Sequence, residues 1–201
     1  MNETQNPVEQ AMWIAKSLFD RGKTSGSSAN LSFRHDGKIY ITGSGTCFGT
    51  LTPESFAVLS KAGKHISGPA PSKEYPLHMA LYKKHPDIHA VIHTHSFHSV
   101  LMSCLPHKDP EDIIPPYTPY LRMQLGRVAF VPYAPPGSKK LFNMFSKRVS
   151  DTWGYILANH GPIVGGKTLM AAFYALEELE ESAKVAWTLR NESDAAVITL
   201  Q

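Results

Sequence analysis

Helix-like and strand-like segments alternate along the whole of this chain, and this alternation is the strongest constraint on its fold. Its 201 residues contain no linker, internal repeat or shift in composition that would divide them. Apolar residues make up 42% of the chain and charged residues 18%, so it can bury a core of its own. We therefore predict an α/β fold, with a single domain over residues 1–201 and a central sheet flanked by helices.

Apolar residues at helical spacing predict four helices. These cover residues 7–21, from about Tyr75 to just before Pro86, 138–151 and 168–190. A Thr-Pro-Glu sequence at 52–54 is typical of a helix start, so we also expect a short helix over 53–59.

Short β-prone runs predict the strands. We expect them at 31–34, 38–42, 89–95, 128–131, 155–158 and 163–164. His35-Asp36-Gly37 indicates a hairpin turn between the first two strands. The proline-rich segment 113–120 is expected to be irregular.

Two histidines at the end of an apolar run give the strongest chemical signal. Side chains two residues apart in a strand point to the same face, so His93 and His95 can reach one metal ion. A catalytic zinc site has three protein ligands and an open position. His160 interrupts a later apolar strand directly before Gly161, and it is the best candidate for the third ligand.

Other histidines and another kind of metal site are alternatives, because ten histidines make chance pairs common. His98 has the wrong parity to share a face with His95 if the strand continues. His89 has the right parity but lies farther along the strand. Cupin-type sites place a glutamate a few residues after the histidine pair, and none occurs here until Glu111.

Glu74 lies in a loop made rigid by Pro69 and Pro71, directly before a predicted helix. A carboxylate held in this way can ligate a metal or act as a general base. Capping of the helix is the alternative and the commoner role. Tyr117 and Tyr120, in the proline-rich segment, are possible general acids, with packing as the commoner role.

Polar residues on several predicted loops suit a phosphate group. They are Asn30, Thr42, Gly43, Ser44, Ser72 and Lys73. Hydroxyls, one ammonium and the free backbone amides expected in the Gly-Ser-Gly loop at 43–45 match a phosphate dianion, although plain turn chemistry explains the same residues equally well. The loop is neither a Walker loop nor a GxGxxG loop.

Charge, cysteine count and hydropathy exclude several classes of partner. The net charge is +3 and no run of five Lys or Arg occurs, which argues against nucleic-acid binding. Cys47 and Cys104 form no CxxC motif, so reduced thiols are expected. We see no signal peptide and no stretch near the roughly 20 apolar residues that cross a bilayer, and we expect a cytoplasmic protein without a membrane partner.

Five short motifs occur in an order that resembles the class II aldolase/adducin-head family, best known for fuculose-phosphate aldolase. They are Ala-Asn-Leu-Ser at 29–32, Ile-Thr-Gly at 41–43, Pro-Ser-Lys-Glu at 71–74, His-Thr-His at 93–95 and Ala-Asn-His-Gly at 158–161. Within the family, segments 71–74, 93–100, 115–120 and 175–184 resemble the 3-oxo-tetronate 4-phosphate decarboxylases.

The resemblance implies a three-layer α/β/α domain around a largely antiparallel sheet, assembled as a homotetramer with sites at subunit boundaries. It implies one Zn²⁺ per subunit, or else Mn²⁺ or Co²⁺, held by His93, His95 and His160. Glu74 is then the catalytic carboxylate, which also ligates the metal when substrate is absent. Tyr120 matches a proton donor to a neighbouring subunit's site.

The same resemblance implies that Asn30, Thr42, Gly43 and Ser72 bind the substrate's phosphate. Lys73 stands where the aldolase has a second serine, and it is left open whether Lys73 holds the phosphate or a carboxylate.

The expected function is a metal-dependent lyase acting on a small phosphorylated sugar-acid. It would decarboxylate a 3-oxo-tetronate 4-phosphate to dihydroxyacetone phosphate and CO₂ through a metal-stabilised enediolate. A sugar-phosphate aldolase forming the same enediolate is the alternative. A dehydratase or epimerase of the same fold, and a non-catalytic adducin-like interaction module, are further alternatives, although an interaction module predicts loss of the metal histidines.

Overall fold

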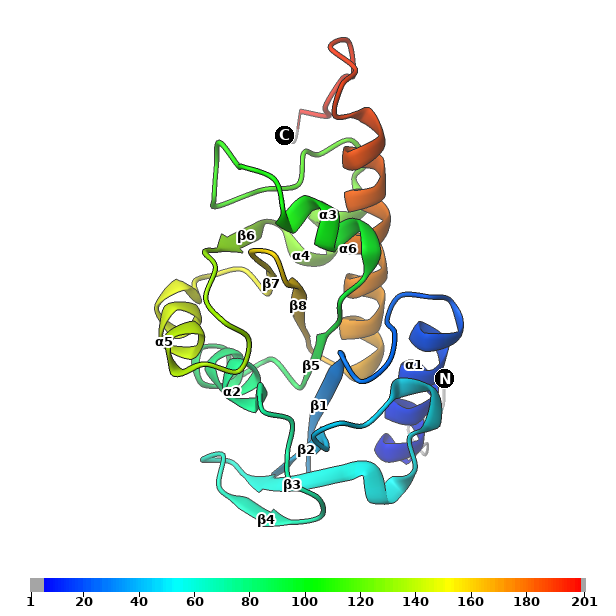
Figure 1. The fold of residues 1–201 in the computed structure, drawn as a ribbon, viewed down its shortest axis with the longest axis vertical. Coiled ribbons are helices and arrows are strands. Elements are labelled where there is room, and N and C mark those ends of the chain that lie inside the picture. Colours follow the sequence, from blue (N-terminus) through cyan, green and yellow to red (C-terminus); the bar gives the residue numbers. More distant parts are fainter. Residues whose placement is uncertain (1–5, 200–201) are drawn as a thin grey trace.

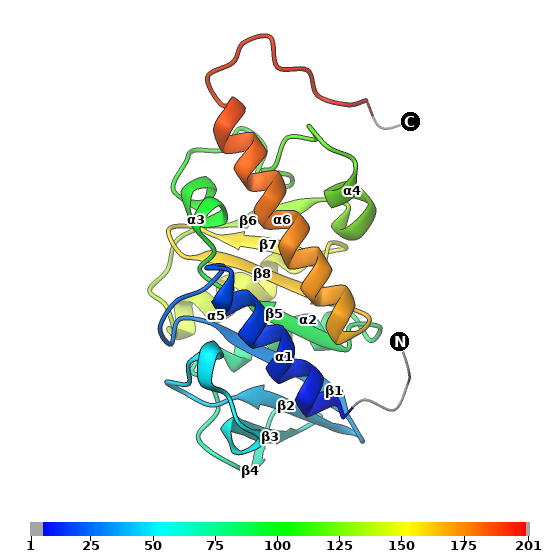
Figure 2. The same cartoon turned by 90° about the vertical axis from the view of Figure 1, so that its right-hand side faces the viewer.

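The computed structural model describes residues 6–199, which form an eight-stranded sheet with helices on both faces (Figures 1 and 2). The strand order is β4-β3-β2-β1-β5-β8-β7-β6. Every neighbouring pair is antiparallel except β6 and β7. The expected α/β/α layers and largely antiparallel sheet are therefore confirmed.

The strands are β1 (Asn30–His35), β2 (Lys38–Thr42), β3 (Phe56–Ser60), β4 (His65–Ser67), β5 (Ala90–His93), β6 (Val128–Val131), β7 (Gly154–Leu157) and β8 (Gly161–Gly166). The helices are α1 (Pro7–Asp20), α2 (Tyr75–Lys84), α3 (Phe97–Ser103), α4 (Tyr120–Leu125), α5 (Lys139–Arg148) and α6 (Leu169–Leu189), with short 3-10 turns at Phe48–Thr50 and Pro53–Ser55. None of the helices in this part of the chain is long and apolar enough to span a membrane.

Helices α1 and α6 cross one face of the sheet, while α2 and α5 cover the other (Figure 2). Side chains that alternate along β5 enter the two cores in turn: Ala90 and Ile92 pack beneath α6, and Val91 packs beneath α2. Since strand side chains alternate with period two, His93 at the end of β5 faces the α2 side. Asn30 and Ser32 of β1 face that side for the same reason.

The first hairpin forms where Asp36 and Gly37 predicted it, and both residues have positive φ, as a tight two-residue turn requires. The predicted helix over 53–59 is wrong. Its Thr-Pro-Glu start makes only the 3-10 turn Pro53–Ser55, and Phe56–Ser60 then pairs with β2 as β3. The apolar residues of this stretch fit a strand covered on both faces better than one helical stripe.

Other element boundaries also differ from expectation, and β8, at Gly161–Gly166, is longer than the predicted strand 163–164. The predicted strand 89–95 is shorter, because β5 ends at His93, and the helix predicted to reach residue 151 ends at Arg148. Helices α3 and α4 were not predicted. Both are short, with six or seven residues, so they carry too little periodicity to be recognised.

Gly166, at the end of β8, touches the first turn of α6. A Cβ atom there would overlap the backbone of Ala171 and Ala172. We expect Gly166→Ala to lower the free energy of unfolding by about 2 kcal/mol, since helix and strand must separate to admit the methyl group. Urea unfolding measures the effect, with the exposed Lys167→Ala as control. Equal stability of the two variants would show that this contact is not tight.

Candidate metal centre

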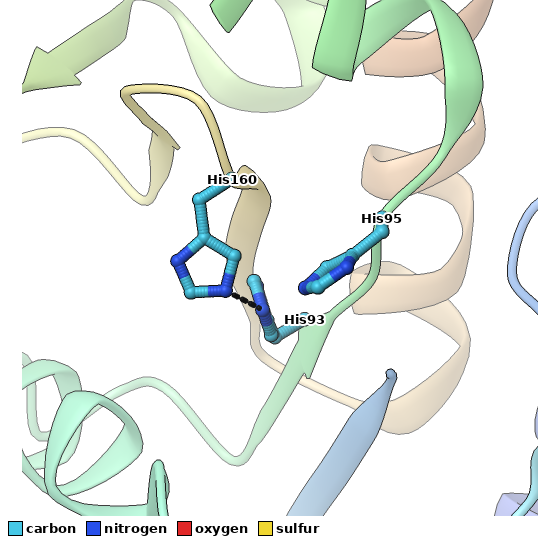
Figure 3. A group of neighbouring side chains, drawn as sticks. All are labelled: His93, His95 and His160. Carbon is cyan, nitrogen blue, oxygen red and sulfur yellow. Dashed lines mark hydrogen bonds between the residues drawn. The ribbon is translucent and has the colours of Figure 1, made fainter. Parts of the chain in front are cut away.

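Three histidine side chains converge beside the end of β5. Each of His93, His95 and His160 offers a ring nitrogen, and the three nitrogens lie within 4.8 Å of one another. Figure 3 shows the rings turned toward a common point, two from the β5 side and one from the turn before β8. The three residues predicted to share a metal are thus brought together by the fold.

Strand pairing positions His93. It lies opposite Asn30 on one side and Ile163 on the other, in the centre of the sheet, and is fully buried. Its Nδ1 lies 2.7 Å from the carbonyl oxygen of Pro162, to which it can only donate. In the neutral ring this hydrogen bond leaves the lone pair on Nε2, which faces the cluster.

His160 lies in the turn that joins β7 to β8. Asn159 before it adopts a left-handed conformation, φ 53°, which asparagine tolerates better than most residues. The amide of Asn159 donates to Ser103 of α3, and that of His160 donates to Leu157. The turn is therefore held by α3 and by the end of β7, and the His160 ring is directed at His93, 3.2 Å away between the Nε2 atoms.

Gly161 allows His95 to approach this turn. A Cβ atom at position 161 would overlap the carbonyl oxygen of Thr94 and come within 3.3 Å of the His95 ring. His95 itself lies beyond the end of β5, so its place in the cluster does not follow from strand alternation alone. Close backbone contact between Thr94 and Gly161 brings it there.

Glu74 completes the centre. It occupies the N-cap position of α2, yet its side chain makes no capping hydrogen bond. Its two carboxylate oxygens lie 3.3 Å from Nε2 of His93 and 3.5 Å from Nε2 of His160 instead. The helix-capping alternative for this residue is therefore not what the structure contains.

The electrostatics of the cluster prepare it for a cation. Burial raises the pKa of Glu74. When the imidazoles are protonated, the hydrogen bond from His93 and the positive charges of the three rings outweigh this and lower the pKa of Glu74 to about 2. Burial lowers the pKa of His95 to about 4 and that of His160 to about 3, with His93 adding to both effects. At neutral pH these shifts give an ionised carboxylate beside uncharged His95 and His160 rings, the protonation states that metal binding needs.

Unpartnered polar atoms show that the cluster fits a metal ion. Nε2 of His95 and Oε1 of Glu74 are buried without a hydrogen-bond partner in the described part of the chain. With Nδ1 of His93 donating to Pro162, neutral imidazole lone pairs and a carboxylate crowd together. Such groups repel unless protons or a cation lie between them, and the donor set of three imidazoles and a carboxylate suits Zn²⁺.

The histidines considered as alternative ligands lie elsewhere. His98 pairs with Glu180, 3.0 Å from Nδ1 to Oε1. His89 is exposed and directly precedes β5, at the opposite end of the strand from His93. The backbone amide of Arg34 donates to the carbonyl oxygen of His89.

Four of the residues predicted to bind phosphate, Asn30, Thr42, Gly43 and Ser72, lie together beside the histidines. Asn30 is the neighbour of His93 in the sheet, and the amide of Leu31 donates to Thr42 Oγ1. Ser72 donates its backbone amide to Thr42, while Gly43 pairs with Pro71. The ends of β1 and β2 and the loop before α2 therefore form one polar edge beside the centre.

The expectation of free amides in the Gly-Ser-Gly loop is wrong for two of the three residues. The amide of Gly43 donates to Ser55 and that of Ser44 donates to Ala70. Gly43 is required by close packing, because a Cβ atom there would lie 2.9 Å from Pro69. This loop is fixed by its neighbours, which sequence alone did not indicate.

Lys73 and Tyr120 stand apart from the cluster within one chain. Lys73 is exposed, and its side chain makes no hydrogen bond or ion pair to residues 6–199. Tyr120 is 60% exposed at the start of α4. A single chain therefore does not bring Tyr120 to the histidines.

Two buried polar residues near the centre were not predicted. Glu180 of α6 accepts hydrogen bonds from the backbone amides of His98 and Ser99, and so anchors the start of α3. It lies on the apolar stripe of its helix, between Leu176 and Ala183, which is a signal the sequence does contain. His78 of α2 hydrogen-bonds to Asn30, and nothing in its sequence context singles it out.

Comparison with known proteins agrees with this geometry. Residues 9–187 match the model of the class II aldolase and adducin N-terminal domain. The chain belongs to this family. The 3-oxo-tetronate 4-phosphate decarboxylase of Escherichia coli K12 is 41% identical over 186 residues, which cover 92% of this chain and 88% of the relative.

Family members with other activities are also similar. L-Fuculose phosphate aldolase of Methanocaldococcus jannaschii is 37% identical over 88% of this chain and 93% of its own. Among solved structures, YgbL of Escherichia coli superposes with a TM-score of 0.91 at 38% identity, covering 96% of this chain and 93% of YgbL. An L-fuculose 1-phosphate aldolase superposes with a TM-score of 0.86 at 28% identity, covering 98% and 92%. Relatives named as decarboxylases and relatives named as aldolases therefore both match over most of this chain.

Removing one imidazole tests the cluster directly. We expect His95→Ala to weaken zinc binding by more than about 100-fold, since even residues that only support a ligand contribute about 10–100-fold. Titration against a chelator measures the affinity, with the exposed His89→Ala as a matched control that keeps it. One equivalent of tightly bound zinc in His95→Ala would show that His95 is not a metal ligand.

Proposed function

We propose that this protein is a metal-dependent carbon–carbon lyase that decarboxylates a 3-oxo-tetronate 4-phosphate to dihydroxyacetone phosphate and CO₂. The observation that carries the proposal is the convergence of three imidazoles with Glu74 beside a polar edge. Five relatives named as this decarboxylase, at 37–41% identity over 91–94% of the chain, support the choice of substrate.

His93, His95 and His160 would hold one Zn²⁺ per subunit, with Mn²⁺ or Co²⁺ as alternatives, and Glu74 would join them when substrate is absent. When bound, such an ion supplies a Lewis acid that stabilises negative charge on substrate oxygens. The residues determine where that charge develops: the histidines lie beside Asn30, so a substrate anchored by its phosphate at the polar edge presents its keto and hydroxyl oxygens to the centre.

The reaction breaks the bond between C1 and C2 of the substrate. C1 leaves as CO₂, and the electron pair stays on C2 and the oxygen at C3, giving an enediolate. One proton then adds to C2 and yields dihydroxyacetone phosphate. Glu74, 12% exposed and facing the imidazoles, is the group placed to take this proton up from solvent during turnover and pass it to C2.

Asn30, Thr42, Gly43 and Ser72 would bind the phosphate. Support comes from their position at one edge, with Asn30, Thr42 and Ser72 buried. The contribution of Gly43 would be its tight packing, because its amide is already used by Ser55. Lys73, exposed at the rim, would supply a positive charge to the phosphate or to the carboxylate.

A sugar-phosphate aldolase is the second candidate, supported by the fuculose phosphate aldolases among the relatives. It forms the same enediolate by releasing an aldehyde. An adducin-like module without catalysis is disfavoured, because such a module has no need for three clustered imidazoles.

Product analysis distinguishes these functions. Zinc-loaded protein is given a panel of 3-oxo-tetronate 4-phosphates and, separately, fuculose and ribulose phosphates. We expect CO₂ and dihydroxyacetone phosphate in equal amounts from the first panel. Release of an aldehyde from the second panel, with no CO₂ from the first, would instead identify an aldolase. No product from either panel would favour the non-catalytic interaction module.

The role of Glu74 predicts a separation of turnover from stability. Glu74→Gln keeps the shape of the side chain but cannot accept a proton, so kcat should fall about 10²–10⁴-fold. Zinc content and unfolding midpoint should stay close to wild type, since the three histidines remain. Glu9→Gln, at an exposed site, is the control. Unchanged turnover in Glu74→Gln would show that another group transfers the proton.

We also propose a cytoplasmic homotetramer in which Tyr120 donates a proton at a neighbouring subunit's site. The exposure of Tyr120 and Met123 on α4, 60% and 75%, supports a contact with another copy, and the two unpaired cysteines suit a reducing compartment. Light scattering and cell fractionation test the assembly and the location.

Subunit mixing tests the shared site. Tyr120→Phe and His95→Ala subunits, each inactive alone, should regain activity when mixed, because some sites then combine an intact metal centre with an intact tyrosine. The control is the same pair of variants mixed under conditions in which the subunits do not exchange. Activity that stays absent after proven exchange would place Tyr120 outside the reaction.

A further inference from the structure

A row of buried polar side chains links α2 to the polar edge beside the metal centre. Asn30 Oδ1 lies 2.5 Å from His78 Nε2, and His78 Nδ1 lies 2.7 Å from Ser32 Oγ. Ser32 Oγ lies 2.8 Å from the hydroxyl of Tyr82. All four side chains are at most 4% exposed, so each proton in the row must have an acceptor within the protein.

The Tyr82 end of the row determines in which direction its hydrogen bonds are donated. The Tyr82 hydroxyl has no other hydrogen-bond partner in residues 6–199, so it must donate to Ser32 or leave its own proton without an acceptor. Ser32 then donates to His78 Nδ1, and His78 carries its proton on Nε2 and donates to Asn30 Oδ1. In the reverse direction the Tyr82 proton would be buried without an acceptor, which is the more costly arrangement.

The direction controls what Asn30 presents to a ligand. With Oδ1 occupied by His78, the amide nitrogen is free, since Nδ2 has no hydrogen-bond partner among the described residues. An amide nitrogen offers only donors, as a phosphate oxygen requires. If the amide were reversed, Asn30 would present its carbonyl oxygen, which repels an anion.

We propose that His78 and Ser32 are positioning residues that fix the amide of Asn30 with its donors toward the substrate's phosphate. The proposal rests on the proposed phosphate site. It assigns a function to a histidine that lies on α2, outside the three-histidine centre. Burial lowers the pKa of His78 to about 3, in keeping with a neutral ring that has one donor and one acceptor.

Two variants of similar size test the direction of the row. Ser32→Ala removes the donor to His78 Nδ1, so either ring tautomer becomes possible and binding of inorganic phosphate to the zinc-loaded protein should weaken about tenfold or more. Tyr82→Phe also removes a buried hydroxyl, but Ser32 can still donate to His78, so phosphate binding should change by less than about twofold.

Calorimetry with inorganic phosphate and ¹⁵N spectra of the His78 ring measure the two effects. We expect the Nε2–H tautomer in wild type and Tyr82→Phe, and a mixture in Ser32→Ala, with zinc affinity equal in all three. Equal phosphate binding in Ser32→Ala and wild type, or equal losses in both variants, would overturn the proposal and leave the proposed function intact. A wild-type protein that binds zinc but neither phosphate nor glycerol phosphate would overturn the phosphate site itself, and this inference with it.

Discussion

The antiparallel pairing of β5 with β8 is the interaction on which the candidate site depends. It places His93 opposite Ile163 and brings the Pro162 carbonyl oxygen to Nδ1 of His93. The same register holds the turn containing His160 over the end of β5 (Figure 3). A shift of one residue would turn His93 to the opposite face and remove the hydrogen bond that sets its tautomer.

The two faces of the sheet differ in the side chains that they carry near the site. The α1 and α6 face is an apolar core over which the long helix lies (Figure 2). The α2 face also carries an apolar core, but near α2 it holds the polar row from Asn30 to Tyr82. Metal centre and polar edge meet at the start of α2, where Glu74 turns away from capping its helix and toward the imidazoles. One helix thus contributes to both halves of the site.

Much of this was predictable from sequence, because it rests on local pattern. Two histidines at strand spacing, and a third before a glycine, indicated the cluster, although His95 lies past the end of β5 and owes its place to the contact with Gly161. The long helix followed from its apolar stripe. The strand Phe56–Ser60 was mistaken for a helix because its preceding Thr-Pro-Glu gives a helix-start signal that β-pairing with β2 overrides. His78, Glu180 and the occupied amides of Gly43 and Ser44 were missed, since each depends on a partner far away in sequence.

The central claim is that His93, His95 and His160 bind one cation together. X-ray absorption at the zinc edge of the protein loaded with one equivalent of metal tests it most directly. We predict three imidazole nitrogens at about 2.0–2.1 Å, with the remaining coordination from oxygen. A spectrum containing sulfur at about 2.3 Å, or only one imidazole, would contradict the account.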